Sequence, residues 1–314
     1  IRQVRWLYPV LRFLLGKALG WKYRIRAHGT ELFRSIKPPY IVLGNHTSVW
    51  DPFLVNANVP EPIHYIVSDT QFRSRLLRFG LGLVGSIPKT KAVSDLETVK
   101  MIIQVKNEPG VIGIFPEGQS SWDGRTLPLV YSTAKLIKSL KQDVVVCRSN
   151  GAFLSRPRWS RDGRRGELHL YFTHLFRSTE LRALSVEDVF QRIRDALQHD
   201  EGAWQRSRRM VYVGKRRAEY LEEALYWCPA CGRFSTLRSR NAHLRCMGCG
   251  YTVRYTVYGQ LLREGDGPQP GTLQEWSDRQ QEALARAIQQ RAQTPTESDP
   301  DAGLFPEEPV EVRI

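Results

Sequence analysis

The stretch Tyr40-Ile-Val-Leu-Gly-Asn-His-Thr-Ser-Val-Trp-Asp-Pro52 decides the fold of this chain. Its first five residues form an apolar run after two prolines, which is typical of a buried strand. His46 follows the end of that run, where open α/β sheets place their ligands. Asp51 and Pro52 indicate a helix start, with the acid as N-cap and the proline at the first helical position. We therefore expect a strand, a polar loop and a helix.

His46 and Asp51 are five residues apart, so on a single helix their side chains would point about 140° apart. They can touch only if the chain turns between them, and a helix that begins at Asp51 favours such a turn. A carboxylate beside an imidazole fixes its tautomer and raises its basicity, which is what activation of a hydroxyl nucleophile requires. The alternative is that Asp51 only caps the helix and that His46 is a polar loop residue.

Apolar runs alternate with helical patterns through the first two thirds of the sequence. We expect further strands at 63–67, 111–115, 144–147 and 168–176, and helices at 72–83, 94–107, 129–140, from 185 onward and at 203–226. Strands that alternate with helices predict an α/β protein with short loops in which chemistry collects.

The composition changes near Tyr226 to a compact Cys-rich module. The sequence therefore predicts four parts: an amphipathic helix (1–22), the α/β domain (23–226), the Cys-rich module (227–262), and a final part (263–314). This final part contains a linker, a helix from Thr272 to about Gln290 and an acidic, Pro-rich tail that we expect to be disordered. The last five residues, from Val310, could form a strand.

Two knuckles define the Cys-rich module: Cys228-Pro-Ala-Cys231-Gly and Cys246-Met-Gly-Cys249-Gly. Each places two thiolates around one ion, so together they predict a closed, four-sulfur zinc ribbon. All four coordination positions are then filled by protein, which makes the zinc structural. A rubredoxin-like iron site and a redox disulfide pair are the alternatives. The fifth cysteine, Cys147, lies on a predicted strand and is expected to be a buried small residue.

Composition excludes several classes of protein. With 314 residues, 41% of them hydrophobic and 25% charged, the chain has the make-up of a globular protein of about two domains. Basic residues interrupt every apolar stretch before it reaches about 18 residues, which argues against an integral multi-span protein. Few cysteines, arranged as knuckles, argue against a disulfide scaffold and for a reducing compartment.

Charge is unevenly distributed along the chain. From Glu264 to the end there are 11 acidic and 4 basic residues, a net charge of −7, so the preceding residues carry +14 + 7 = +21. Such a body attracts polyanions: nucleic acid, anionic lipid headgroups or phosphate-bearing metabolites such as coenzyme A.

The opening segment, Trp6 to Trp21, is apolar but has basic residues set among aromatic ones. It is too charged to span a membrane and suits a helix that lies in a membrane interface, with snorkelling cations and tryptophan anchors. A first helix packed on the core would show the same amphipathicity, so both interpretations stay open. We expect no cleavable signal, and a natural start upstream of Ile1.

Three blocks of residues occur together with the order and spacing of a known family. They are Asn45, His46 and Asp51 as Asn-His-x4-Asp, Gly85 to Lys91 as a looser second block, and Phe115 to Gly118 as Phe-Pro-Glu-Gly. Over about residues 1–215 the chain resembles the lysophospholipid acyltransferase family, the glycerolipid acyltransferases that make phosphatidic acid. The resemblance implies a mixed sheet flanked by helices.

The resemblance also implies roles for the site residues. His46 is expected to be the general base and Asp51 to orient it. The residues expected to bind the acceptor are Asn45, Lys89, Lys91, Glu117, Gly118 and Arg125, although Arg125 can equally belong to a solvated loop. The implied donor is acyl-CoA or acyl-carrier protein, and the foremost acceptor is 1-acyl-sn-glycerol 3-phosphate. The implied location is the cytoplasm, peripherally on the inner face of an anionic membrane.

The sequence departs from the family pattern in three places. Lysine replaces the arginine of the second block, the third block continues as Gln119-Ser120-Ser121 where Thr-Arg-Ser is common, and the fourth block at Val144 to Cys147 lacks its proline. Lysine keeps the charge but loses the bidentate fork that arginine offers to phosphate, so the acceptor stays open. A non-catalytic lipid-binding protein of the same fold is one alternative function.

Another alternative is a zinc-ribbon protein that binds nucleic acid and carries an inert α/β scaffold. The module's arginines favour it: Arg233, Arg238, Arg240, Arg245 and Arg254. Basic charge is non-specific, however, so we expect nucleic acid not to be the partner.

Overall fold

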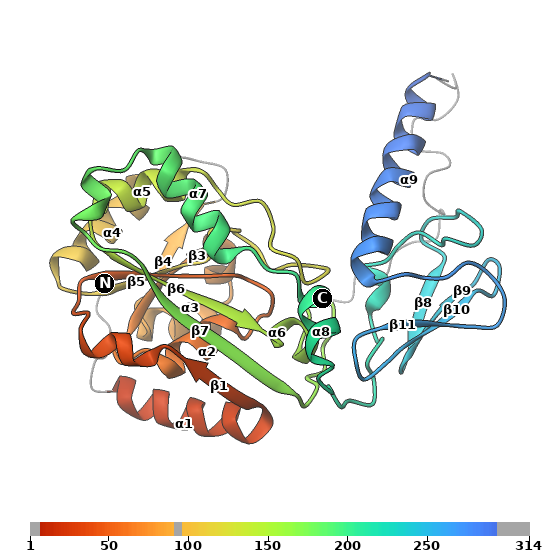
Figure 1. Ribbon diagram of the computed structural model, residues 1–314, viewed down its shortest axis with the longest axis horizontal. Helices are drawn as coiled ribbons and strands as arrows, with labels where there is room; N and C mark the ends of the chain where they lie inside the picture. The colour runs from red at the N-terminus through yellow and green to blue at the C-terminus, as the bar shows by residue number, and fades with distance from the viewer. Residues whose placement is uncertain (1–6, 91–95, 294–314) are drawn as a thin grey trace. The chain divides into compact units, whose positions relative to one another are not determined.

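The computed structural model describes residues 7–90 and 96–293 (Figure 1). By their contacts the residues form two compact units. The first comprises Ile1–Arg158 and Arg165–Trp204, and the second comprises Trp159–Arg164 and Gln205–Ile314, each as far as it is described.

A seven-stranded mixed sheet forms the centre of the first unit. Its strands are β1 (Arg24–His28), β2 (Tyr40–Gly44), β3 (Ile63–Ser68), β4 (Ile87–Lys89), β5 (Val111–Ile114), β6 (Asp143–Asn150) and β7 (Glu167–Phe176). They lie in the order β1-β7-β6-β2-β5-β3-β4. Strands β6, β2, β5, β3 and β4 are parallel to one another. Strand β7 is antiparallel to β6, and β1 is parallel to β7. The predicted mixed α/β sheet is thus confirmed.

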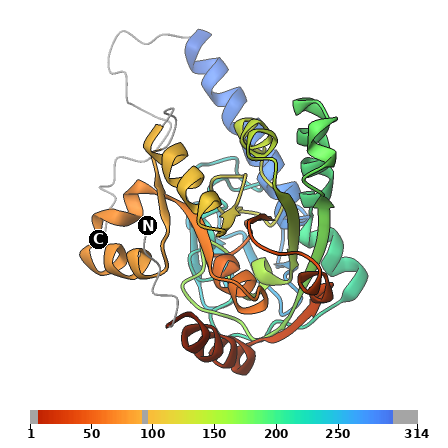
Figure 2. The same ribbon diagram turned by 90° about the vertical axis from the view of Figure 1, so that its left-hand side faces the viewer.

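Helices cover both faces of this sheet (Figures 1 and 2). The described helices of the unit are α1 (Leu7–Lys22), α2 (Asp51–Asn58), α3 (Arg75–Leu83), α4 (Leu96–Asn107), α5 (Ser132–Leu140), α6 (Ala152–Ser155), α7 (Val186–Leu197) and the start of α8 (Glu201–Arg208). Short 3-10 helices occupy Thr30–Arg34, Asp69–Arg73 and Glu180–Arg182. Helices α1 and α2 lie on one face, and α4, α5 and α7 lie on the other.

Strand β2 is buried on both faces, which explains its continuous apolar run. Tyr40 and Val42 pack in the core under α1 and α2, together with Leu54. Ile41 and Leu43 pack in the opposite core, under α4, α5 and α7. A parallel central strand has no solvated face, so polar residues appear only where it ends, at Asn45.

The second unit contains a four-stranded antiparallel sheet in the order β11-β10-β9-β8. Its strands are β8 (Leu237–Arg240), β9 (His243–Cys246), β10 (Thr252–Tyr255) and β11 (Leu261–Glu264), followed by α9 (Leu273–Gln293). A short 3-10 helix occupies Leu221–Glu223. Reciprocal hydrogen bonds between Thr272 and Glu275 cap α9 where the sequence predicts its start.

The segment Trp159–Arg164 belongs to this second unit although the residues on either side of it belong to the first. Arg164 is 2% exposed, and its guanidinium lies 4.9 Å from the ring centroids of both Trp159 and Tyr255. It also donates to the carbonyl of Arg217 at 2.5 Å. A cation between two aromatic faces anchors this six-residue excursion.

Three helix boundaries differ from the sequence expectation. The basic helix expected at 203–226 ends at Arg208, because Arg209 has a φ of 52° and the Gln205 side chain bonds both backbone groups of Met210. Helix α3 begins only at Arg75, where Ser74 Oγ accepts from the Leu77 N–H. Helix α5 begins at Ser132, three residues later than expected.

Several sequence expectations lie outside the described residues. They concern Lys91, the Ser94 cap, the disordered tail and the final strand from Val310. Within the described residues, no helix combines the length and the apolar character that a membrane span requires.

Candidate active site and metal centre

Two loops leave the same edge of the sheet and meet at His46. Strands β2 and β5 are parallel neighbours, with Leu43 paired to Ile114, so the loops after them start side by side. The His46 N–H donates to Glu117 Oε1 at 2.7 Å, and the His46 carbonyl accepts from the Ser121 N–H at 2.8 Å. The backbone of His46 is therefore held from both sides by the loop that follows β5.

A glycine allows an aromatic ring to support His46. The imidazole and the Phe115 ring have centroids 4.6 Å apart. A Cβ added at Gly44 would lie 2.6 Å from Phe115 Cε1, which is closer than carbon atoms can approach. Only glycine at the end of β2 leaves room for Phe115 beside the imidazole.

The structure brings His46 and Asp51 together, as the turn between them predicts. Nδ1 of His46 lies 3.0 Å from Oδ2 of Asp51. The same oxygen accepts the N–H groups of Thr47 and Ser48, each at 2.7 Å. The Asp51 side chain is 1% exposed and that of His46 is 20% exposed, so the carboxylate is buried while the imidazole reaches the surface.

The expectation that Asp51 is an N-cap is wrong. Asp51 is the first residue of α2, and Trp50 occupies the cap position without a side-chain hydrogen bond. Three donors converge on the Asp51 carboxylate from the preceding turn, so it bends back toward His46 and leaves the helix end uncapped.

This geometry favours proton transfer at the other ring nitrogen. An ionised carboxylate only accepts hydrogen bonds, so Nδ1 of His46 carries the proton and Nε2 keeps its lone pair. When Nε2 takes a proton, the charge that develops lies beside a buried anion. The pair can thus act as a base with an orienting partner.

Glu117 joins the two loops rather than facing solvent. Its second oxygen, Oε2, accepts the Leu127 N–H at 2.8 Å, and Glu117 is only 6% exposed. Burial raises the pKa of this carboxyl to about 7, against the lowering effect of the hydrogen bonds from Leu127 and His46. The next residue, Gly118, has a φ of 71° and closes a turn onto the Phe115 carbonyl at 3.0 Å.

Asn45 likewise holds the scaffold. Its amide accepts the Ser149 N–H at 2.7 Å and donates to the Ser149 carbonyl at 3.0 Å. The residue is 1% exposed. It therefore ties the end of β2 to β6, on the side opposite β5.

Two of the expected phosphate-binding cations, Lys89 and Arg125, lie within the described residues. Lys89 ends β4, which β5 and β3 separate from β2, a distance of about 14 Å at the usual strand spacing. Arg125 donates through Nε and Nη2 to Asp123 Oδ2, at 3.0 and 2.7 Å.

Sequence reasoning missed two arginines beside the loops. Arg156 lies over the Trp50 ring, and Arg158 lies over the Trp122 ring. The only signal in the sequence is the run Arg-Pro-Arg-Trp at 156–159, which has no helical or strand periodicity.

The four cysteines of the predicted zinc ribbon come together in the second unit. Cys228 and Cys249 have sulfurs 3.8 Å apart, as have Cys231 and Cys246, and all four sulfurs lie within 4.8 Å of one another. Four sulfurs at about 2.3 Å from one zinc ion lie about 3.8 Å apart in a tetrahedron. The donor set therefore fits zinc.

Both knuckles close in the same way. The N–H of Gly232 donates to the Cys228 carbonyl at 2.8 Å, and that of Gly250 to the Cys246 carbonyl at 2.9 Å. These glycines have φ values of 73° and 79°, which explains why each Cys-x-x-Cys pair is followed by glycine.

Residues 24–148 match the model of the Acyltransferase family. This match spans the three blocks and agrees with the family resemblance seen in them.

Among solved structures, the chain is similar to the 1-acyl-sn-glycerophosphate (LPA) acyltransferase PlsC from Thermotoga maritima. The two share 16% identity over 61% of this chain and 83% of that one, with a TM-score of 0.47. A comparison with curated proteins finds no match.

Replacing Cys246 with serine tests the metal centre. We expect the wild-type chain to hold one zinc ion and Cys246→Ser to hold markedly less, because one of four thiolates is lost. Metal content after dialysis, measured by mass spectrometry, gives the result, and Cys147→Ala is the matched control because Cys147 lies in the other unit. Full zinc occupancy in Cys246→Ser would contradict the assignment.

Glu117 predicts a pH dependence of stability. The unfolded chain loses this proton near pH 4.5 and the native chain near pH 7, so the unfolded state binds fewer protons between these values. The free energy of unfolding should fall by roughly 3 kcal/mol over that window.

Urea unfolding at several pH values measures this dependence. In Glu117→Gln the fall should be absent, while Glu97→Gln, at an exposed position, should retain it. Identical pH slopes in the wild type and in Glu117→Gln would contradict the assignment.

Proposed function

We propose that the chain transfers a fatty acyl group from a thioester to the hydroxyl group of a lysophospholipid, with 1-acyl-sn-glycerol 3-phosphate as the foremost acceptor. The observation that carries the proposal is the His46–Asp51 pair, 3.0 Å apart, at the edge of an acyltransferase domain. The product would be phosphatidic acid. The proposed donor is acyl-CoA or acyl-carrier protein.

The residues of the pair divide the reaction between them. Nε2 of His46 removes the proton of the acceptor hydroxyl as its oxygen attacks the thioester carbonyl carbon. The carbon–sulfur bond then breaks, an ester remains, and the imidazolium returns its proton to the departing thiolate. Asp51 stabilises the imidazolium between these steps through the hydrogen bond at Nδ1. The two loops hold the base in place, so little ordering is needed when the substrates bind.

The four cysteines are proposed to hold a structural zinc ion. Every sulfur of the set comes from the protein, which leaves no open position for a substrate. The zinc ion would cross-link the two knuckles and would take no part in acyl transfer.

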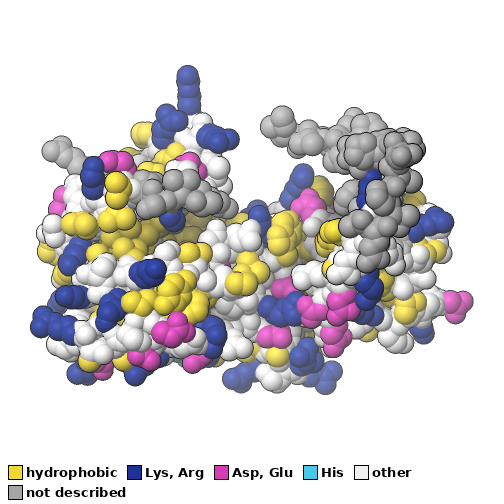
Figure 3. All heavy atoms as spheres, turned by 90° about the horizontal axis from the view of Figure 1, so that it is seen from above, with side chains coloured by type: hydrophobic (Ala, Val, Ile, Leu, Met, Phe, Trp, Pro, Cys, Tyr) yellow, Lys and Arg dark blue, Asp and Glu magenta, His cyan; other side chains and the backbone are white. Residues whose placement is uncertain are grey.

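We also propose that α1 lies in the interface of an anionic membrane on its cytoplasmic face. One face of α1 packs on the unit: Leu19 is buried in the core and the Tyr8 hydroxyl donates to the carbonyl of Glu61 at 2.9 Å. The other exposes large apolar side chains, with Phe13 62% and Trp21 81% exposed. Basic side chains also lie on α1, where the Lys17 ammonium lies 5.5 Å from the centroid of the Phe13 ring, which suits anionic headgroups. Figure 3 shows lysine and arginine side chains among hydrophobic ones on another face, away from α1.

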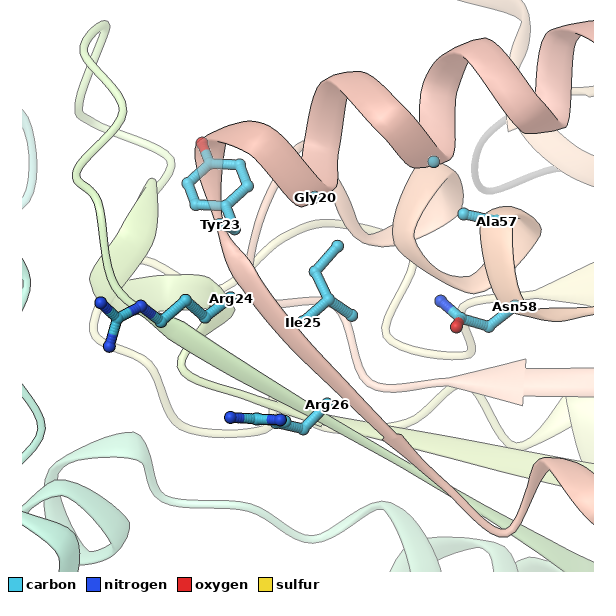
Figure 4. Close-up of a pocket in the computed structure, with 8 residues that line it drawn as sticks. Gly20, Tyr23, Arg24, Ile25, Arg26, Ala57 and Asn58 are labelled. Atoms are coloured by element: carbon cyan, nitrogen blue, oxygen red, sulfur yellow. The ribbon is translucent and has the colours of Figure 1, made fainter.

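A hollow of about 440 Å³ adjoins α1, and its lining includes the polar residues Tyr23, Arg24, Arg26 and Asn58 (Figure 4). Gly16 and Gly20 of α1 line it because they carry no side chain, together with Ile25 of β1 and Ala57 of α2.

Changing the pair tests the mechanism. His46→Ala should lower kcat by about 10²–10⁴, the usual contribution of a positioned general base. Asp51→Asn should also lower kcat because it mis-sets the tautomer, and the double variant should be little worse than the single ones. Thiol release from acyl-CoA or acyl-carrier protein, over a panel of lysolipids, measures the rates.

His174→Ala is a matched control, because His174 faces Asp143 at 3.5 Å but lies on β7. It should retain the wild-type rate. If His46→Ala were as active as the wild type, the proposed mechanism would fail. If Asp51→Asn were as active as the wild type while His46→Ala was not, Asp51 would have only a structural role.

Removing apolar side chains from α1 tests the membrane proposal. The double variant Phe13→Ser/Trp21→Ser should sediment less with vesicles that contain phosphatidylglycerol, and wild-type binding should weaken as salt rises. Turnover of a soluble short-chain acceptor should stay constant. Leu262→Ser, at an exposed position of the second unit, is the control. Unchanged binding of the double variant would contradict the proposal.

A further inference from the structure

The segment that follows α6 carries two arginines, and each lies over an indole from one of the two loops at His46. The guanidinium of Arg156 lies 5.4 Å from the ring centroid of Trp50, which precedes Asp51. The guanidinium of Arg158 lies 4.4 Å from the ring centroid of Trp122, which follows the Ser121 that bonds the His46 carbonyl.

Both arginines are fixed in position. The carbonyl of Arg156 accepts from Ser48 Oγ at 2.9 Å, within the turn between His46 and Asp51. Nη1 of Arg158 donates to Gln119 Oε1 at 3.2 Å and to the Ser120 carbonyl at 3.1 Å. Pro157 between them disfavours helical backbone at Arg156, which has a φ of −158° and a ψ of 83°. The hydrogen bonds therefore hold the backbone of Arg156 and the guanidinium of Arg158, and the Arg156 guanidinium is placed by its contact with the Trp50 ring.

Neither guanidinium has a carboxylate to neutralise it among the described ion pairs, although both side chains are half buried. Burial lowers the pKa of Arg158, which reflects the loss of water around its charge. A half-buried cation without a counter-ion is costly unless an anion binds beside it.

Buried donors surround Arg156 without an acceptor. In the described part of the chain, no hydrogen-bond partner exists for Nε of Arg156, Nε1 of Trp50 or the hydroxyl of Tyr23. Tyr23 is 2% exposed, and the charge of Arg156 opposes the rise in its pKa that burial causes, so the two side chains are near each other. Several buried donors that lack an acceptor indicate a place for the oxygens of an anion.

We propose that Arg156 and Arg158 form an anion subsite that binds a phosphate group of a substrate beside His46. Guanidinium groups bind phosphate oxygens through paired N–H donors, and two such groups match the charge of a phosphate monoester. The inference rests on the proposed function insofar as it names the ligand. Two sources share this chemistry: the headgroup of a lysophospholipid acceptor and the nucleotide part of a coenzyme A thioester.

The acceptor arm of the experiment compares lysophosphatidate with a monoacylglycerol of the same chain length. In Arg158→Gln and Arg156→Gln, the ratio of kcat/KM for the two acceptors should fall by about 10–100-fold, the usual effect of losing a charge-assisted hydrogen bond. Arg158→Lys, which keeps the charge without the fork, should lie between the wild type and Arg158→Gln.

The donor arm compares acyl-CoA with the same acyl chain on pantetheine. If the phosphate belongs to coenzyme A, the donor ratio falls and the acceptor ratio stays constant; a fall in either ratio supports the subsite. Arg192→Gln is the matched control, because Arg192 also lies over an aromatic ring, that of Phe176, but on α7. It should leave both ratios unchanged.

A purely structural role of Arg156 and Arg158 predicts a different result. If the arginines only hold the loops, their loss lowers turnover of phosphorylated and phosphate-free substrates equally, and both ratios stay at the wild-type value. That result would overturn the inference. Where Arg158→Gln does not fold, Arg158→Lys carries the same comparison.

Binding without turnover separates this inference from the proposed function. Titration calorimetry with lysophosphatidate and monoacylglycerol, each below its micellar concentration, and with coenzyme A and pantetheine, needs no acyl transfer. If the wild type releases no thiol, the proposed function fails. Preferential binding of either phosphorylated ligand by the wild type and not by Arg158→Gln would still support the subsite. Equal binding of phosphorylated and phosphate-free ligands by the wild type would overturn it.

Discussion

The hydrogen bonds that the His46 peptide makes to the loop after β5 are the constraint on which the site depends. The Glu117 carboxylate accepts the N–H of His46, and the Ser121 N–H donates to the carbonyl of His46. The base therefore cannot move without the loop that follows β5. Both bonds are possible because β2 and β5 are parallel neighbours whose ends coincide. The sheet thus fixes the place of the imidazole, and Asp51 needs only to fix its rotation and its proton.

Much of this arrangement could be predicted from the sequence. The apolar run that ends at Gly44 identifies a central strand because burial on both faces leaves no polar position. The reciprocal hydrogen bonds of Ser185 and Asp188 confirm a helix start that depends on local backbone chemistry alone. The two Cys-x-x-Cys-Gly knuckles are local in the same sense, which is why the cluster of four sulfurs could be foreseen.

The failures of sequence reasoning concern side-chain contacts that neither helix propensity nor periodicity indicates. The basic stretch after Arg208 has good helix formers, yet Arg209 takes a left-handed backbone and the helix stops. Aspartate is a common N-cap residue, but the N–H groups of Thr47 and Ser48 in the preceding turn bind the Asp51 carboxylate instead. The stacking of Arg156 on Trp50 joins residues more than 100 positions apart, and no periodicity in either loop could indicate it.

The excursion from Trp159 to Arg164 means that the chain passes between the two units three times, after Arg158, after Arg164 and after Trp204. No single cut separates them. A truncation after Trp204 would retain Arg164 and the Trp159 ring but remove the Tyr255 ring and the Arg217 carbonyl, so the guanidinium would lose two of its three partners named above. The first unit therefore cannot be cut from this chain as one continuous piece, because a protein shortened after Trp204 would keep the segment Trp159–Arg164 without most of the unit to which it belongs.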